Sequence, residues 1–143
     1  MVINDKQDQL LKRLSRELKL KLVVLYGSKA GGVINQESDL DLAVMTETKP
    51  NLRLFNRLYH SLSEIFPGEA ADVHFLNGAD PLFLIQVVKN GCLLAGSRAD
   101  FIELKIQTNR RYIDDGRKYF PYLEQLLKNQ QKHLSRIMMS PGN

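Results

Sequence analysis

The sequence predicts an α/β (α+β) domain: a small mixed β-sheet flanked by helices, with a long C-terminal helical segment. Two observations predict this class. Short apolar runs typical of strands alternate with longer stretches of helical periodicity, and glycine or proline separates most of them. A chain of 143 residues is long enough to bury one core. We therefore divide it into a core, residues 1–97, and a helical extension of the same domain, residues 98–143.

The first third of the chain is expected to form a helix and two strands. Leucines at helical spacing among charged residues predict a helix over 5–19. Residues 22–26 (LVVLY) are apolar, branched and stopped by Gly27, which is typical of a buried strand. The small polar residues 28–38 favour a turn with at most a short helix. Alternating acidic and apolar residues over 39–45 predict a second strand.

Two helices and a third strand are expected next. Pro50 suits the first turn of a helix that ends at Pro67-Gly68. The apolar positions of 71–76 predict a third strand. Asp80-Pro81 then provides an N-cap and a first-turn proline for a largely buried helix through Val88. The coarse order so far is helix, strand, strand, helix, strand, helix.

The end of the chain predicts a short fourth strand over 92–95 and a long helix. Ser97 and Asp100 have the spacing of a capping box, and Pro121 predicts a kink or break. The single cysteine, Cys92, has no partner for an internal disulfide and is expected in the core. With no secretory signal and no run of about 18 apolar residues, the sequence predicts a cytoplasmic protein.

The net charge of +4 belongs to residues 98–143, which hold 9 of the 20 basic and 5 of the 16 acidic side chains. A basic surface favours an anionic partner such as a nucleic acid, a nucleotide or an acidic protein face. A solvated helix face with a cationic bias explains the charge equally well. Tyr112 and Tyr119 lie among arginines and lysines, a mixture that suits nucleic acid or an amphipathic helix docked on the domain.

The most informative pattern is the pair Asp39 and Asp41. Residues two apart in a strand point to the same face, so both carboxylates share one face while Leu40 and Leu42 enter the core. Like charges at this distance repel unless a cation lies between them, and Mg²⁺ prefers carboxylate oxygens and substrate phosphates. The alternative explanation is a solvent-facing edge strand whose two negative charges prevent pairing with strands of other chains.

Two further features favour the metal site. Asp72 opens the third predicted strand, on the face that also holds His74, and a neighbouring strand would bring Asp72 beside the acidic pair. Three carboxylates around two metal ions can activate an attacking oxygen and neutralise a leaving one. Gly27-Ser28 ends an apolar strand, where backbone N–H groups can approach phosphates closely.

These residues together resemble a known signature. Gly27-Ser28-x-Ala30-x-Gly32, followed by Ser38-Asp39-Leu40-Asp41-Leu42, is similar to the G-S-x-A-R-G and S-D-x-D-L motifs of the DNA polymerase β-like nucleotidyltransferases. The resemblance is strongest to the minimal, single-domain branch and, within it, to MntA-type antitoxins that pair with HEPN-domain (HepT) toxins. It covers nearly the whole chain.

The resemblance implies an enzyme that transfers AMP from ATP with two Mg²⁺ ions. It implies that Asp39 and Asp41 bridge the metals and that Asp72 binds the catalytic metal and helps to deprotonate the acceptor hydroxyl. The acceptor that it implies is a tyrosine of the cognate HEPN toxin, which is thereby silenced. The implied nucleotide-binding residues are Gly27, Ser28, Lys29 and Ser38.

One position departs from the family pattern. Gly31 stands where the pattern has arginine, so metal ligation stays intact while turnover is expected to suffer, with Lys29 as a partial replacement. Other functions remain open: an antitoxin that neutralises by binding alone, an aminoglycoside-type nucleotidyltransferase, or a nucleic-acid-binding module. A homodimer or a hetero-oligomer with the toxin is open as well. His74 either borders the acceptor site or is a structural, hydrogen-bonded histidine.

Overall fold

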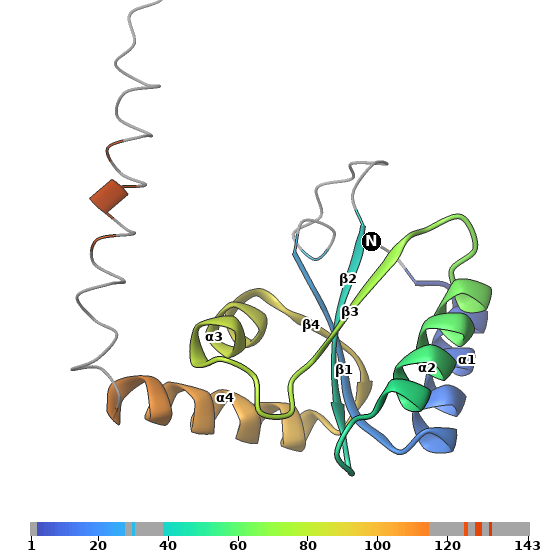
Figure 1. The fold of residues 1–143 in the computed structure, drawn as a ribbon, viewed down its shortest axis with the longest axis horizontal. Coiled ribbons are helices and arrows are strands. Elements are labelled where there is room, and N and C mark those ends of the chain that lie inside the picture. Colours follow the sequence, from blue (N-terminus) through green and yellow to red (C-terminus); the bar gives the residue numbers. More distant parts are fainter. Residues whose placement is uncertain are drawn as a thin grey trace, which may run out of the picture. The chain divides into compact units, whose positions relative to one another are not determined.

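The computed structural model describes residues 3–27, 30, 39–114, 125, 128, 129 and 132. Helices and strands follow one another in the predicted order, and the predicted fold class is confirmed (Figure 1). The elements are α1 (Asp5–Glu17), β1 (Leu20–Tyr26), β2 (Leu40–Thr46), α2 (Leu52–Ile65), β3 (Ala71–Phe75), α3 (Pro81–Asn90), β4 (Cys92–Gly96) and α4 (Arg98–Asp114).

The four strands form one mixed sheet in the order β3-β2-β1-β4. β1 pairs antiparallel with β2 and β4, whereas β2 and β3 run parallel. Parallel neighbours need a long crossover, and α2 provides it between β2 and β3. The end of β1 and the beginnings of β2, β3 and β4 therefore lie side by side at the same end of the sheet.

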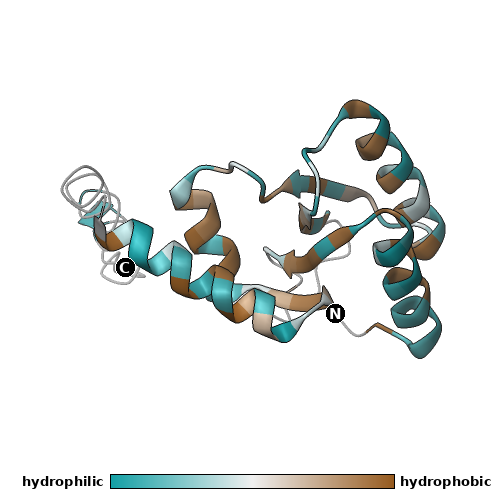
Figure 2. Ribbon diagram, turned by 90° about the horizontal axis from the view of Figure 1, so that it is seen from below, coloured by the Kyte–Doolittle hydropathy of each residue, from teal (hydrophilic) through white to brown (hydrophobic). Residues whose placement is uncertain are grey.

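Each face of the sheet packs on its own helices. Figure 1 shows α1 and α2 on one side of the strands and α3 with the start of α4 on the other. In Figure 2 the strands are mostly brown, whereas α1 and α2 mix brown with teal, as expected of helices that bury one face. Alternate residues of β2 serve the two cores: Leu42 packs on the α1–α2 side and Ala43 on the α3–α4 side, both fully buried.

Local capping explains where the helices begin. The side chain of Asn4 caps α1 and accepts a hydrogen bond from the Gln7 N–H (2.7 Å). Asp80 caps α3 and accepts one from the Leu82 N–H (2.8 Å), with Pro81 in the first turn, as predicted. Pro50 does not lie in α2, contrary to the prediction, because Asn51 is the N-cap and accepts from the Leu54 N–H.

Cys92 is exposed, so the prediction that it lies in the core is wrong. It opens β4, which among the strands of the described residues lies at the edge of the sheet and pairs with β1. β1 also begins two residues before its predicted start, since Leu20 pairs with Thr46.

The contacts of the chain divide it into residues 1–108 and residues 109–143, and all elements through β4 belong to the first unit. The Ser97 hydroxyl accepts a hydrogen bond from the Asp100 N–H (3.3 Å) at the start of α4. The predicted break at Pro121 and nearly all of the predicted turn 28–38 lie outside the described residues. Within the described part, no helix has the length and apolar character needed to cross a bilayer.

Candidate active site at one edge of the sheet

Two carboxylates face each other where β2 and β3 begin. Asp41 and Asp72 are register partners in the parallel ladder. They occupy the face opposite Leu40 and Leu42, which are fully buried against α1 and α2. The side chain of Asp72 is half exposed and thus reachable by a ligand. The structure therefore brings together two acids that lie far apart in the sequence.

Asp39, the third predicted acid, lies one residue before β2 and is exposed. Its backbone position continues the two-residue alternation of Asp41, and Leu40 ties this point to the neighbouring strand through a hydrogen bond from its N–H to the Ala70 carbonyl (2.7 Å). Asp39 therefore lies just before β2, at the same end of the strands as Asp41 and Asp72.

Gly27 directly follows β1 and is in contact distance of Asp41. Its φ of +78° belongs to the left-handed region, and a Cβ placed on it would collide with Oδ2 of Asp41. Only glycine combines this backbone conformation with the close approach of the carboxylate. Gly27 therefore lies directly against Asp41, and its predicted approach to phosphates stays a prediction.

Tyr26 extends the acidic pair across a third strand. It is the register partner of Asp41 in the antiparallel ladder, so Tyr26, Asp41 and Asp72 form one row over β1, β2 and β3. Burial, and then the charges of Asp41 and Asp72, raise the pKa of the Tyr26 phenol to about 12. Tyr26 was not among the predicted site residues because it reads in the sequence only as the last residue of an apolar strand.

His74 lies two residues along β3 from Asp72 and shares its face. Its Nε2 is 3.1 Å from Oδ2 of Asp72, and both side chains are about half exposed. Phe83 of α3 contacts the rings of both His74 and Tyr26, at centroid distances of 5.6 and 5.4 Å. Of the two options left open for His74, the hydrogen-bonded histidine is present, and it lies at the edge of the candidate site.

These residues fit a hard divalent cation. Within the described residues, no three His, Cys, Asp or Glu side chains are close enough to hold an ion by themselves. Mg²⁺ does not need such a cage, because enzymes that act on phosphates usually bind it through one or two carboxylates plus substrate phosphate oxygens. Asp41 and Asp72 supply oxygen donors on adjacent strands at an accessible edge. The remaining predicted residues Ser28, Lys29 and Ser38, and Gly31, lie outside the described residues.

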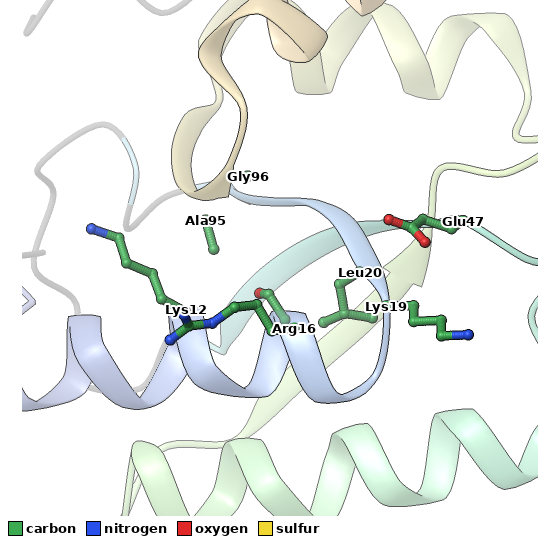
Figure 3. A pocket seen from close by; sticks show the side chains of 8 residues that line it. Lys12, Arg16, Lys19, Leu20, Glu47, Ala95 and Gly96 are labelled. Atoms are coloured by element: carbon green, nitrogen blue, oxygen red, sulfur yellow. The ribbon is translucent and has the colours of Figure 1, made fainter.

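A basic hollow of about 610 Å³ lies at the opposite end of β1. Lys12 and Arg16 of α1 line it together with Lys19 and Leu20, and Glu47 follows β2 at its rim. Figure 3 shows Lys12 and Lys19 extending in opposite directions, so their ammonium groups do not converge on one point. No predicted site residue lines this hollow.

Comparisons with known proteins agree with the fold. A toxin–antitoxin structure with AMP-PNP has 23% sequence identity and a TM-score of 0.70, covering 84% of this chain and 98% of its own. A complex of a tri-AMPylated Shewanella oneidensis HEPN toxin with an MNT antitoxin has 21% identity and a TM-score of 0.65, covering 85% and 97%. A structure described as a minimal nucleotidyltransferase has 28% identity and a TM-score of 0.53, covering 61% and 87%.

No curated protein matches the sequence. The model of the polymerase beta nucleotidyltransferase family, in contrast, matches residues 8–100, a segment that contains the whole sheet and every carboxylate of the candidate site. The chain therefore belongs to the polymerase beta nucleotidyltransferase family.

Proposed function

We propose that this protein is a Mg²⁺-dependent adenylyltransferase that transfers AMP from ATP to a tyrosine hydroxyl of a cognate HEPN toxin, and thereby acts as its antitoxin. The observation that carries the proposal is the register pairing of Asp41 with Asp72 beside Gly27. Family membership supports the reaction class. The similar structures that hold AMP-PNP or an AMPylated toxin support the nucleotide and the partner.

Asp39, Asp41 and Asp72 are the residues that would hold two Mg²⁺ ions. Bound there, the cations would neutralise charge on the phosphates and on the acceptor oxygen. Gly27 and Ser28 would present backbone N–H groups to the β- and γ-phosphates, with Lys29 and Ser38 nearby in the sequence. Without the cations the carboxylates would repel both each other and a nucleotide, so the metal requirement follows from their charge.

The transfer step needs an acceptor oxygen, and Asp72 is placed to serve it. The tyrosine oxygen would form a bond to the α-phosphorus of ATP while the bond from that phosphorus to the bridging oxygen breaks, releasing pyrophosphate. The carboxylate of Asp72 would take the hydroxyl proton. It lies on the edge strand β3 and is half exposed, so a side chain from another protein can reach it.

The test combines the purified protein, ATP and Mg²⁺ with the product of the adjacent reading frame, provided that this frame encodes a helical protein with an Arg-x(4–6)-His motif. Intact-mass spectrometry of both chains is expected to show one or more AMP units on the partner. Asp39→Ala should abolish the gain, whereas Asp5→Ala should not, because Asp5 is an exposed carboxylate in the first turn of α1.

Other outcomes would identify a different function. A stable complex without any mass gain would contradict the enzymatic proposal and identify an antitoxin that neutralises by binding, with Gly31 as the first position to change to arginine. Transfer of AMP to an aminoglycoside but not to the protein partner would contradict the proposed acceptor. Binding to nucleic acid that weakens steeply with salt would point to the basic residues of 98–143 instead.

A further inference from the structure

Asp72 has a hydrogen-bond partner on its own strand, His74. The two side chains come from one strand, two residues apart, and therefore stand on the same face. Nε2 of His74 lies 3.1 Å from Oδ2 of Asp72. An ionised carboxylate only accepts hydrogen bonds, so Nε2 carries the proton and donates it. One of the two oxygens of Asp72 is thus engaged, and Oδ1 is left for another ligand.

The imidazole ring is held by aromatic neighbours from two other elements. Tyr26 of β1 meets it edge-on with a centroid distance of 6.4 Å, and Phe83 of α3 lies at 5.6 Å. Tyr26 and Phe83 also contact each other, at 5.4 Å and nearly perpendicular. Edge-to-face packing of this kind restricts the orientation of a ring. The direction of the Nε2–H bond is therefore set by the packing between the sheet and α3.

The imidazole is better suited to orient a ligand than to be one. Mg²⁺ prefers oxygen donors, and no group of three potential ligands that includes His74 is formed among the described residues. Carboxylates that ligate metals are commonly hydrogen-bonded in turn by a neighbouring residue. Loss of such a neighbour typically weakens metal binding or activity by about 10- to 100-fold.

We infer that His74 is a positioning residue: packed against Tyr26 and Phe83, it donates to Oδ2 of Asp72 and orients this carboxylate toward the cation and the acceptor hydroxyl. The inference rests on the proposed function, because it assigns Asp72 to the metal and the acceptor. Without His74 the half-exposed carboxylate of Asp72 can rotate about its side-chain bonds. Cation binding would then have to fix its orientation, and the lost conformational entropy would weaken the binding.

Two substitutions separate the hydrogen bond from the packing. His74→Phe keeps an aromatic ring against Tyr26 and Phe83 but has no N–H, whereas His74→Gln places an amide N–H near the position of Nε2 and loses the ring. The control is His60→Phe. His60 makes the same kind of contact with Glu64 (3.2 Å), but on the exposed side of α2 and outside the candidate site.

The measurement is the affinity of the protein for Mn²⁺ with AMP-PNP, from the electron paramagnetic resonance signal of Mn²⁺ after subtraction of the Mn²⁺ that AMP-PNP binds without protein, and it needs no turnover. His74→Phe should bind Mn²⁺ about 10- to 100-fold more weakly, and His74→Gln should recover most of this loss. His60→Phe should equal the wild type. In AMP transfer, His74→Phe should lower kcat with little change in the KM for ATP, since the phosphate-binding residues are untouched.

Unchanged Mn²⁺ affinity in His74→Phe would overturn the inference, and so would an equal loss in His74→Gln, which would assign the effect to the ring. Thermal unfolding of each variant shows whether it folds. If one of the two His74 variants is unstable, the other still tests the inference. Failure of the proposed function is recognised separately by mass spectrometry, since a wild type that binds Mn²⁺ with AMP-PNP but adds no AMP to the protein partner would contradict the proposed transfer and leave the Mn²⁺ comparison of the His74 variants valid.

Discussion

The two faces of the sheet differ along the same stretch of strand. On the α1–α2 face, β2 contributes Leu40, Leu42 and Val44, all fully buried, so apolar packing runs the whole length of the strand. On the α3–α4 face, Ala43 is fully buried in the apolar core. Two residues earlier, the same face carries Asp41, which lies in one row with Tyr26 and Asp72. Core residues and residues of the candidate site thus alternate along one strand.

This division has a physical reason. A carboxylate stays charged only where water or a cation can reach it, whereas an apolar side chain stabilises the fold only where water is excluded. A strand separates these needs over a single residue because consecutive side chains point to opposite faces. Neighbouring substitutions in β2 should therefore have opposite consequences.

The largest effect is expected from Asp41→Asn. The substitution keeps the shape of the side chain and removes the charge that would hold a cation, so AMP transfer should fall by at least about 10³-fold. The free energy of unfolding should change by less than about 1 kcal/mol, because one of two repelling carboxylates is neutralised. Transfer assays and urea unfolding of the same preparation check both. Retained transfer would show that the acidic face is not the active site.

Leu42→Ala, one residue further, should do the reverse. Leu42 is fully buried in the core against α1 and α2, and its truncation leaves a cavity. We expect a loss of about 3 kcal/mol in the free energy of unfolding. The remaining folded fraction should transfer AMP at the wild-type rate. Thermal melts and specific activity below the transition measure this. A large loss of activity without a loss of stability would contradict the assignment of this face of β2 to stability alone.

Gly27→Ala should lower both the stability of the fold and the binding of Mn²⁺ and nucleotide. Alanine at φ +78° costs about 1–2 kcal/mol, and its Cβ also displaces the carboxylate of Asp41. Gly68→Ala is the matched control, since Gly68 has a φ of +81° with no atom near the added Cβ. Both variants should lose similar backbone stability, but only Gly27→Ala should weaken Mn²⁺ and nucleotide binding. Equal binding in the two variants would mean that the closeness of Gly27 to Asp41 has no functional role.

A smaller effect is expected in the titration of Tyr26. The folded protein should hold this proton up to a pKa of about 12, whereas the unfolded chain loses it near pH 10. Because the folded state then binds more protons, the contribution of Tyr26 to stability falls as the pH rises from about 10 to 12. Ultraviolet tyrosinate titration, with Tyr26→Phe as the difference reference, measures the pKa.

The same titration separates the two causes of the shift. Asp72→Asn should lower the Tyr26 pKa only in part, since burial is the larger cause. A pKa that returns fully to its ordinary value in this variant would contradict that order of causes.

The smallest effect should come from the basic hollow at the far end of β1. Arg16→Ala removes a cation from its lining, and no residue of the Asp41–Asp72 edge contributes to that lining. Transfer of AMP to the protein partner should stay within about twofold of the wild type, in line with exposed positions elsewhere. A larger drop in the rate would extend the functional surface beyond the acidic edge of the sheet.

Local patterns in the sequence were sufficient for the order of the elements and for the face of β2 that Asp41 occupies. The alternation in β2 shows by itself that Asp41 faces away from Leu42, because a strand has a fixed two-residue period. The cap at Asp80 and the glycine after β1 likewise depend only on near neighbours in the chain. Pro50 was misplaced because it and Asn51 both carry helix-start signals, and the hydrogen bond to the Leu54 N–H decides between them.

Tertiary structure alone decided which distant residues meet. The parallel register of β2 and β3 brings Asp72 opposite Asp41, and the antiparallel register of β1 adds Tyr26. Phe83 reaches His74 because α3 packs on this face, and the exposure of Cys92 likewise depends on the packing of the folded chain. The sequence determines which face of each element is apolar, since that depends on local periodicity. Sheet order and register depend on how all the apolar faces pack together, and so they emerge only in the folded chain.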